Sequence, residues 1–286
     1  MEALILNPGS APLSRNIEDY PDGIIIPIDK PYRWTSADVI RKVKYAAIRH
    51  FGKKNLKVGH AGTLDPLATG ILLVCIGKAT KLAETLQSHD KEYIAGITFG
   101  ATTPSYDLEK EIDRMFPYEH ITAESILEVL PAFIGEQDQV APLFSAKSVD
   151  GVRAYELARK LHKEGKTLDQ AAQELIRTAR INIPELELLE FNAAGSGCGL
   201  KNRVFQTTIT SASSRINVTD NSSLGLPHAS IRMACSKGTY VRAFARDLGE
   251  ALGSGAHLDS LQRSRSGIFK VEDALSIEQT LEKLAQ

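Results

Sequence analysis

The pattern of apolar and polar positions predicts a series of short strands and helices along the first hundred residues. The apolar run 23–29 predicts a strand at the edge of a sheet, because Pro27 has no amide hydrogen to donate to a neighbouring strand. The continuous apolar run Ile71–Ile76 is bounded by glycines and predicts a buried strand. Two more segments complete this part of the pattern: a helix over 78–87 and a strand over 93–99.

The clearest helix signal covers Thr35 to Phe51. Apolar residues recur there at helical spacing, Thr35 or Ser36 can cap the N-terminus, and Gly52 stands where a left-handed C-terminal cap is expected. The opposite face of this helix carries basic residues.

The second half of the chain continues to mix the two kinds of element. The pair Asp150-Gly151 lies between short strand-like segments and predicts a hairpin over 148–153. Helices are expected over 122–133, 154–164 and 240–252, and strands over 181–191, 203–210 and 230–235. Strand and helix do not alternate regularly, so we predict an α+β fold with a mixed, mostly antiparallel central sheet flanked by helices.

The formal net charge of −1 conceals two regions of opposite sign. Residues 31–60 contain eight Lys or Arg and one acid, for a local charge of about +7. Residues 107–136 contain eight acids against two bases, for a local charge of about −6. Two solvated faces explain this asymmetry, and so does a basic face that attracts phosphate groups; charge alone does not decide between them.

Composition excludes several classes of protein. The three cysteines are scattered, with no Cys-x-x-Cys pair and no histidine spacing suited to zinc, so we expect no metal site and no disulfide framework. No apolar run is long enough for a signal peptide or a membrane span. We therefore expect a cytoplasmic protein without a membrane partner.

The segment Val58–Gly70 has the most marked chemistry. Three glycines and a proline surround one histidine, His60, and one carboxylate, Asp65, in a loop before the buried strand. A rigid loop at the entrance of a strand is suited to a functional site. From the residues alone, however, Asp65 before Pro66 is also typical of a turn, and a lone histidine is often structural.

An ordered set of motifs resolves this ambiguity. The motifs are Asp29-Lys-Pro31 with Thr35-Ser36, Gly59–Gly70, Lys91-Glu-Tyr93, Phe144-Ser-Ala-Lys147 with Val149–Tyr155, Ser236–Arg242, and Gly255-Ala-His257 leading to Leu261 and Arg263. In this order they resemble the bacterial tRNA pseudouridine-55 synthases of the TruB type. The resemblance covers roughly residues 24–271 and implies an isomerase that converts one uridine in the T-arm of tRNA to pseudouridine.

The resemblance also implies roles for individual residues. Asp65 would be the catalytic nucleophile, Tyr93 would stack on the target uracil, and Arg242 would pair with Asp65 and keep it ionised. His60 would brace the gap left by the flipped base. Further substrate-binding roles fall on these residues: Tyr240, Leu261 and Lys81. Isomerisation oxidises, phosphorylates and hydrolyses nothing, so no cofactor is expected. Three routes remain open for the Asp65 carboxylate: attack on the anomeric carbon of the ribose, attack on C6 of the uracil ring, and abstraction of a sugar proton.

The family also provides an expectation for domain organisation. We expect a loose leader over 1–22 and one catalytic domain over 23–286, with an insertion over about 137–178 that resembles the family's RNA clamp. Many relatives carry a separate C-terminal RNA-binding domain, which we expect to be absent here. The stretch 192–227 is rich in Gly, Ser and Asn, and no function is predicted for it.

The expected partner is the T-arm stem-loop of tRNA, bound by a monomer without an obligatory protein partner. The basic helix over 35–51 would contact phosphates. Two alternatives belong to other classes: a tRNA-folding chaperone or RNA-binding module without catalysis, and a guide-dependent pseudouridine synthase. The intact set of Asp65, Tyr93 and Arg242 favours the enzyme over the chaperone.

Overall fold

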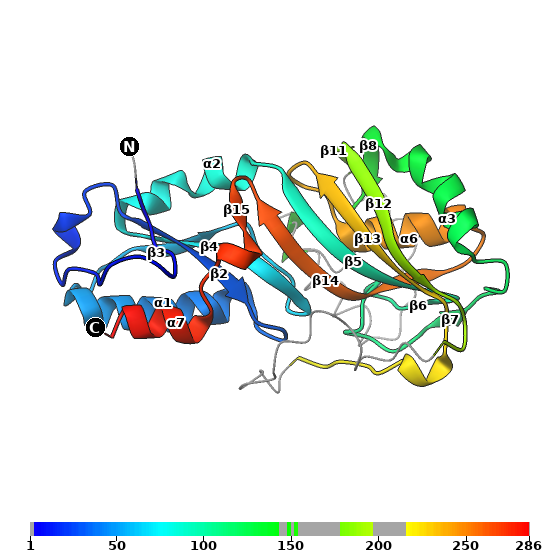
Figure 1. Cartoon of the computed structure of the whole chain (residues 1–286), viewed down its shortest axis with the longest axis horizontal. Coiled ribbons are helices and arrows are strands. Elements are labelled where there is room, and N and C mark those ends of the chain that lie inside the picture. Colours follow the sequence, from blue (N-terminus) through cyan, green and yellow to red (C-terminus); the bar gives the residue numbers. More distant parts are fainter. Residues whose placement is uncertain (1–2, 143–147, 150–151, 154–177, 197–215, 286) are drawn as a thin grey trace. The chain divides into compact units, whose positions relative to one another are not determined.

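The computed structural model describes residues 3–142, 148–149, 152–153, 178–196 and 216–285, which group into two compact units (Figure 1). Unit 1 comprises residues 1–94, 203–216 and 260–286, and unit 2 comprises residues 95–202 and 217–259. The elements form an α+β fold, as predicted. The principal sheet has the strand order β1-β2-β4-β14-β5-β13-β12, with β3 also paired to β4 and β15 to β14.

Unit 1 is built around two central strands with a helical layer on each face. Its elements are β1 (Leu4–Ile5), η1 (Ile17–Asp19), β2 (Ile24–Lys30), α1 (Ser36–Phe51), β3 (Val58–Ala61), β4 (Ala68–Ile76), η2 (Gly77–Leu82), α2 (Ala83–Ser88), β15 (Phe269–Lys270), η6 (Val271–Asp273) and α7 (Ile277–Lys283). Strands β5 (Lys91–Phe99) and β14 (Ala256–Ser266) contribute residues to both units.

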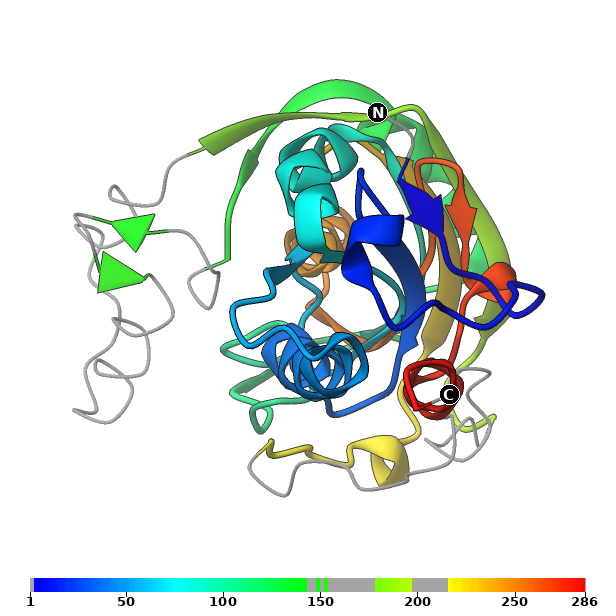
Figure 2. The same cartoon turned by 90° about the vertical axis from the view of Figure 1, so that its left-hand side faces the viewer.

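The period of two along β2 and β4 creates the two layers. Alternate residues such as Ile26 and Val74 face one buried cluster, which also contains the apolar face of α1 and residues in and beside α7. The residues between them, such as Ile25 and Leu73, face a second cluster with η2 and α2. Figures 1 and 2 show α1 and α7 on one side of these strands and α2 on the other. Both strands are buried almost throughout because both faces are covered.

Helix α1 forms where the sequence predicts it. Thr35 is the N-cap, and its side chain accepts a hydrogen bond from the amide of Asp38. The side chain of Asp38 in turn accepts from the amide of Thr35, which completes a capping box. The helix ends at Gly52, whose φ of 63° lies in the left-handed region. Both ends are therefore determined by local sequence.

The edge position predicted for 23–29 is wrong. β2 pairs with β4 on one side and with the short strand β1 on the other, although β1 reaches only Ile24 and Ile25. The carbonyl of Pro27 accepts from the amide of Leu275, on the side away from β4. Because the N and O of one residue point the same way in a strand, the amide that Pro27 lacks is not needed by β4.

Unit 2 contains the remaining elements. They are β6 (Ala101–Thr102), β7 (Arg114–Met115), α3 (Ala123–Val129), η3 (Leu130–Phe133), β8 (Gly135–Val140), β9 (Ser148–Val149), β10 (Val152–Arg153), β11 (Thr178–Ile183), β12 (Glu185–Asn192), η5 (Ser222–Leu224), β13 (His228–Cys235) and α6 (Val241–Ala251). The sheets are mixed: β4 and β14 run parallel, whereas β2 and β4, β12 and β13, and β8 and β11 run antiparallel.

In unit 2 the structure contradicts one predicted strand and confirms the predicted hairpin. The segment 181–191 is not one strand, because Pro184 separates β11 from β12 and each pairs with a different neighbour. The predicted hairpin is confirmed by the antiparallel pairing of β9 with β10. The helix expected over 154–164 and the strand over 203–210 lie outside the described residues.

Candidate active site

Asp65 lies in the loop between β3 and β4 of unit 1, and the backbone before it is anchored to α1. The hydroxyl of Ser36, at the start of α1, accepts a hydrogen bond from the amide of Leu64 at 2.9 Å. The same hydroxyl donates to the carbonyl of Leu64 at 3.1 Å. Both side chains are buried, so the peptide groups before Asp65 are fixed without solvent.

The backbone after Asp65 is held by Lys30 and Arg33. The carbonyl of Pro66 accepts from the ammonium of Lys30 at 3.2 Å and from the amide of Arg33 at 3.0 Å. Lys30 also donates to the carbonyls of Pro31 and Trp34, at 3.0 and 2.6 Å. Arg33 has a positive φ of 63°, which is unusual for a residue with a side chain and marks a tightly constrained turn.

Lys30 is a buried cation next to a proposed catalytic carboxylate. Its side chain is fully buried, and this burial lowers its pKa to about 7. Arg263 adds to the decrease in pKa, whereas the Asp65 carboxylate opposes it. Charge–charge interaction with Asp65 therefore favours the protonated form of Lys30, the form that donates to the loop carbonyls.

Arg263 holds the same loop from β14. Its Nη2 donates to the carbonyl of Gly62 at 3.2 Å and its Nε to the carbonyl of Ile71 at 2.7 Å. Strand β14 runs parallel to β4 with Arg263 opposite Gly70. Gly70 has a φ of 96°, and a Cβ there would collide with the carbonyl oxygen of Arg263. Only glycine fits this contact.

His60 is a half-buried residue of β3, opposite Val74. Burial and the positive charge of Arg263 lower the pKa of His60, with a smaller opposing effect from the backbone of Gly62. The ring is consequently neutral at pH 7. A neutral imidazole is suited to packing against bases rather than to pairing with a phosphate.

Tyr93 and Leu261 are partly buried residues of strands β5 and β14. Both pack against the large apolar cluster of unit 1, to which Leu64, the residue before Asp65, and Ala68, three residues after it, also belong. Leu261 is opposite Ala68 in the pairing of β14 with β4. Strand pairing therefore places Leu261 next to the end of the Asp65 loop, and the stacking role of Tyr93 stays a prediction. Lys81 lies near the end of η2 with an exposed side chain, and its role stays a prediction.

Arg242 is in unit 2, on the first turn of α6, and its side chain is only 7% exposed. Its Nη1 donates to the carbonyl of Ser105 at 3.1 Å and lies 3.7 Å from Oδ2 of Asp107. Asp107 in turn accepts from the hydroxyl of Ser105 at 2.6 Å and from the amide of Glu109 at 3.0 Å. The pairing of Arg242 with Asp65 stays a prediction.

Tyr240 is held in unit 2 by a glutamine from the start of the predicted insertion. The side-chain amide of Gln139 accepts from the backbone amide of Tyr240 at 2.8 Å and donates to its carbonyl at 3.2 Å. Gln139 is on β8, which pairs with β11 from Val140 and Thr178 onward. The strands at the two ends of the predicted clamp are thus paired with each other, while most of the clamp lies outside the described residues.

Sequence reasoning missed several groups that position this site. Lys30 and Arg263 appear in the motifs, but nothing local indicates that both are buried against the Asp65 loop. Asp107 belongs to the acidic stretch 107–136, which the sequence alone explains as a solvated face, yet it is 7% exposed and pairs with Arg242. Asp107 follows a turn in which the amide of Tyr106, at a positive φ of 55°, donates to the carbonyl of Thr103, and the sequence of this turn gives no sign that Asp107 is buried.

The described residues contain no group of three or more His, Cys, Asp or Glu side chains placed to hold a metal ion. Within the same residues, no helix has the length and apolar character needed to cross a bilayer.

Comparison with known proteins gives consistent matches. Residues 49–196 match the family model for the TruB family pseudouridylate synthase N-terminal domain, and residues 242–286 match the tRNA pseudouridylate synthase B C-terminal domain. The chain is 47% identical to the tRNA pseudouridine synthase B of Phocaeicola vulgatus over 94% of its own length and 96% of the relative. It is 46% identical to the protein of the same name from Bacteroides fragilis, over 90% and 92%.

A solved structure supports the fold. A chain of the crystal structure of a Cbf5-Nop10-Gar1 complex is similar with a TM-score of 0.58 and 24% identity, over 98% of this chain and 63% of that one. At this identity the similarity concerns the fold alone.

Proposed function

Because the chain belongs to the TruB family of pseudouridylate synthases and is thus a tRNA pseudouridine synthase, an isomerase, we propose that its target is uridine 55 in the T-arm and that Asp65 is the nucleophile. The observation that carries the proposal is the rigid loop around Asp65. Ser36 fixes the residue before it, and Lys30 and Arg33 fix the residue after it.

The reaction requires a carboxylate held in a fixed position, and it consumes no further reagent. The bond between N1 of uracil and the anomeric carbon breaks, the ring turns, and a bond forms from C5 to the same carbon. The C5 proton is then lost and N1 gains one, so atoms and charge balance without an oxidant or a cofactor. A fixed carboxylate can form the transient covalent bond in either nucleophilic route, since nucleophilic catalysis depends on a well-positioned group.

Access to Asp65 requires base flipping. A uridine stacked within a folded RNA arm cannot reach a carboxylate in a loop, so it is extruded into the site. Tyr93 provides an aromatic surface for the extruded base, and Leu261, opposite Ala68 at the end of the Asp65 loop, provides an aliphatic one. His60, neutral and half-buried, braces the position that the base leaves.

Arg242 would keep Asp65 ionised within the closed site, since a guanidinium can contact both oxygens of a carboxylate. Its neighbour Asp107 acts as a positioning residue. Asp107 is itself bonded to Ser105 and to the amide of Glu109, so it holds the guanidinium in one orientation.

The experiment that tests this function is tritium release from a tRNA transcript labelled at C5 of uracil, with the purified protein alone. The wild type should release tritium, and Asp65→Asn should release none. Equal release from the two would refute the role of Asp65. Arg242→Ala should lose most of its turnover but still bind tRNA, and unchanged turnover would remove the role of Arg242.

The substrate position and the alternatives are tested with the same assay. A transcript with cytidine at position 55 should release no tritium above background from the T-loop, whereas replacing another T-loop uridine should leave release intact. Release from the tRNA transcript by the purified protein, without a guide RNA or a partner protein, excludes a requirement for a guide. Tritium release itself separates catalysis from a chaperone role. A chelator should not change the rate, and strong inhibition would indicate a metal.

A further inference from the structure

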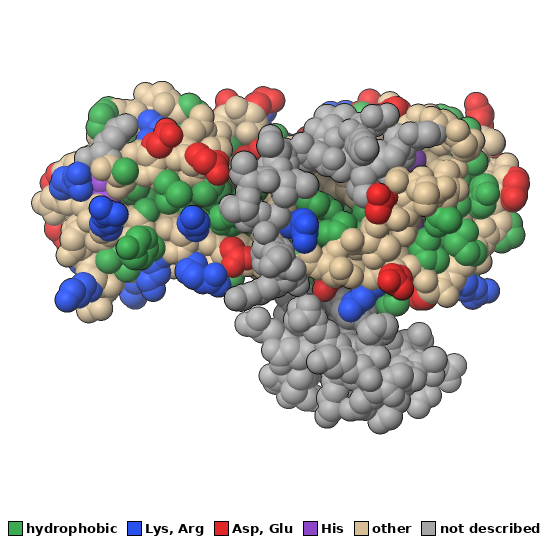
Figure 3. All heavy atoms as spheres, turned by 90° about the horizontal axis from the view of Figure 1, so that it is seen from below, with side chains coloured by type: hydrophobic (Ala, Val, Ile, Leu, Met, Phe, Trp, Pro, Cys, Tyr) green, Lys and Arg blue, Asp and Glu red, His purple; other side chains and the backbone are tan. Residues whose placement is uncertain are grey.

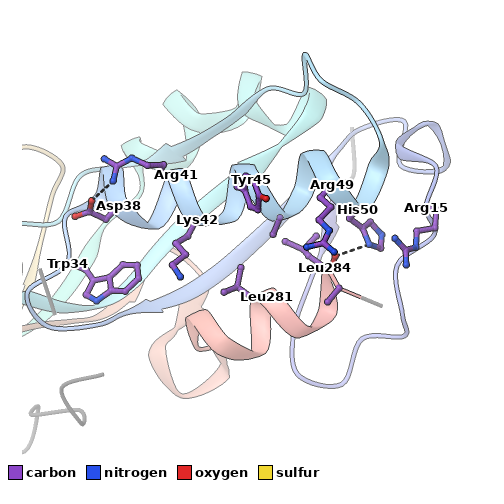
Figure 4. Close-up of a pocket in the computed structure, with 12 residues that line it drawn as sticks. Arg15, Trp34, Asp38, Arg41, Lys42, Tyr45, Arg49, His50, Leu281 and Leu284 are labelled. Carbon is purple, nitrogen blue, oxygen red and sulfur yellow. Dashed lines mark hydrogen bonds and ion pairs between the residues drawn. The ribbon is translucent and has the colours of Figure 1, made fainter. Parts of the chain in front are cut away.

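Unit 1 has a groove between helices α1 and α7 that the active site does not use. The groove has a volume of about 830 Å³, and Figure 4 shows its lining residues along the length of α1. We call it the α1–α7 groove. Helix α1 has 16 residues and is therefore about 24 Å long, so the groove is long enough for several units of a linear polymer.

The groove is positively charged. Lys42 and Arg49, both exposed on α1, line it and have no ion-pair partner in the described part of the chain. Asp38 is the acid among the lining residues, and it is occupied by Arg41 at 2.9 Å and by the capping box of α1. Figure 3 shows Lys and Arg side chains gathered around hydrophobic ones on the face seen from below.

An exposed aromatic ring lies among these charges. Tyr45 is 73% exposed, and it is one helical turn from Arg41 on one side and from Arg49 on the other. A large exposed ring between cations is the arrangement with which proteins bind single-stranded nucleic acid, because a base stacks on the ring while phosphates contact the cations.

A buried donor without a partner lies at one end of the groove. Trp34 is 8% exposed, and its indole Nε1 has no acceptor among the described residues. A buried N–H without an acceptor carries a cost in free energy, so this position is suited to an acceptor oxygen of a ligand. Trp34 lines the groove at the N-terminal end of α1 (Figure 4).

The same end of the groove adjoins the active-site loop. Lys30 donates both to the carbonyl of Trp34 and to the carbonyl of Pro66, the residue after Asp65. A strand that carries a uridine at Asp65 therefore lies close to the entrance of the groove.

We propose that the α1–α7 groove binds an unpaired strand of the RNA substrate. Phosphates contact Lys42 and Arg49, one base stacks on Tyr45, and an oxygen of the strand accepts from the indole of Trp34. The proposal rests on the proposed function for the choice of polymer. An acidic peptide would use the cations equally well but would gain less from a flat aromatic ring.

The test is fluorescence anisotropy with two labelled probes, a tRNA transcript and unstructured pentaadenylate. Lys42→Glu and Arg49→Glu should each weaken binding of both probes by about tenfold. Each should also reduce the slope of a plot of the logarithm of the association constant against the logarithm of the salt concentration by about 0.7. Tyr45→Leu should weaken binding by about tenfold, whereas Tyr45→Phe should bind as the wild type does, because the stacking ring remains. These side chains are exposed, so folding is not at risk.

The control is Lys270→Glu on β15, an exposed lysine of the same unit that does not line the groove; it should leave both affinities unchanged. The proposal is overturned if the groove variants bind both probes as tightly as the wild type, or if a hexaglutamate peptide competes as well as pentaadenylate. Failure of the proposed function gives a different result: the wild type then releases no tritium, whatever the affinities of the variants.

Discussion

The hydroxyl of Ser36 and the backbone of Leu64 are hydrogen-bonded in both directions, at 2.9 Å from the amide and 3.1 Å to the carbonyl. This pair connects the first residue of α1 to the residue before Asp65. The conformation of the proposed catalytic loop therefore depends on the position of a helix that begins 29 residues earlier in the sequence.

Ser36→Ala should destabilise the protein and slow turnover. The change leaves a buried amide and a buried carbonyl of Leu64 without a partner, which costs about 1–3 kcal/mol. Chemical denaturation measures the free energy of unfolding, and kcat for tritium release measures the effect on Asp65. Ser88→Ala, at an exposed position of α2, is the matched control and should change stability by less than about 0.5 kcal/mol. Similar stabilities for the two variants would contradict this account of the loop.

Burial of Lys30 should make stability rise with pH in the alkaline range. The pKa of Lys30 is about 7 in the folded protein and near 10.5 when unfolded, so between these values the unfolded chain binds a proton that the folded chain lacks. Raising the pH from about 7 toward 10.5 then favours the folded state, by at most about 1.4 kcal/mol per pH unit.

Lys30→Met removes this titration, so its free energy of unfolding should rise less steeply across the same pH range. Urea denaturation at a series of pH values gives both curves. Lys270→Met, at an exposed lysine, should retain the wild-type slope. If Lys30→Met had the same pH profile as the wild type, the low pKa of Lys30 would be wrong.

Gly70→Ala should prevent stable folding. The new Cβ would meet the carbonyl of Arg263 on the neighbouring strand, at a φ of 96° that alanine rarely adopts. The loss should exceed about 4 kcal/mol, the range of severe core disruptions. Gly52→Ala is the control, because Gly52 also has a positive φ, of 63°, but nothing lies within 4 Å of its Cβ; it should cost about 1–2 kcal/mol. Thermal unfolding measures the difference between the two variants. Equal midpoint temperatures for Gly70→Ala and Gly52→Ala would show that the structure relieves the collision at Gly70.

Asp107→Asn should lower kcat while leaving the affinity for tRNA nearly unchanged. Asparagine can still accept from Ser105 and Glu109, but it no longer attracts the Arg242 guanidinium 3.7 Å away. We expect a decrease in kcat of about tenfold, equivalent to about 1.4 kcal/mol of barrier. Asp113→Asn replaces another acid of unit 2, one bonded to Thr102 at an exposed site, and should retain wild-type kcat. A parallel change in Kd and kcat would indicate a general structural role for Asp107 instead.

Sequence alone determined the elements whose ends depend on local chemistry. The capping box at Thr35, the left-handed Gly52 and the helical period between them define α1, and the unbroken apolar run defines β4. It also identified the loop that carries Asp65, because glycines, a proline and a carboxylate in one segment are recognisable without any distant contact. Pro184 shows the limit of apolar pattern reading, since one proline divided the strand predicted over 181–191.

Only the tertiary structure decided which polar groups are buried and what they hold. Lys30, Arg263 and Asp107 are ordinary charged residues in the sequence, and each acquires its role from backbone groups or charges on other segments. Whether a charged side chain is buried depends on what packs around it. Arg263 donates hydrogen bonds to the carbonyls of Gly62 and Ile71, which lie about two hundred residues earlier in the sequence. The sequence by itself located the carboxylate, and the long-range packing determined how that carboxylate is held.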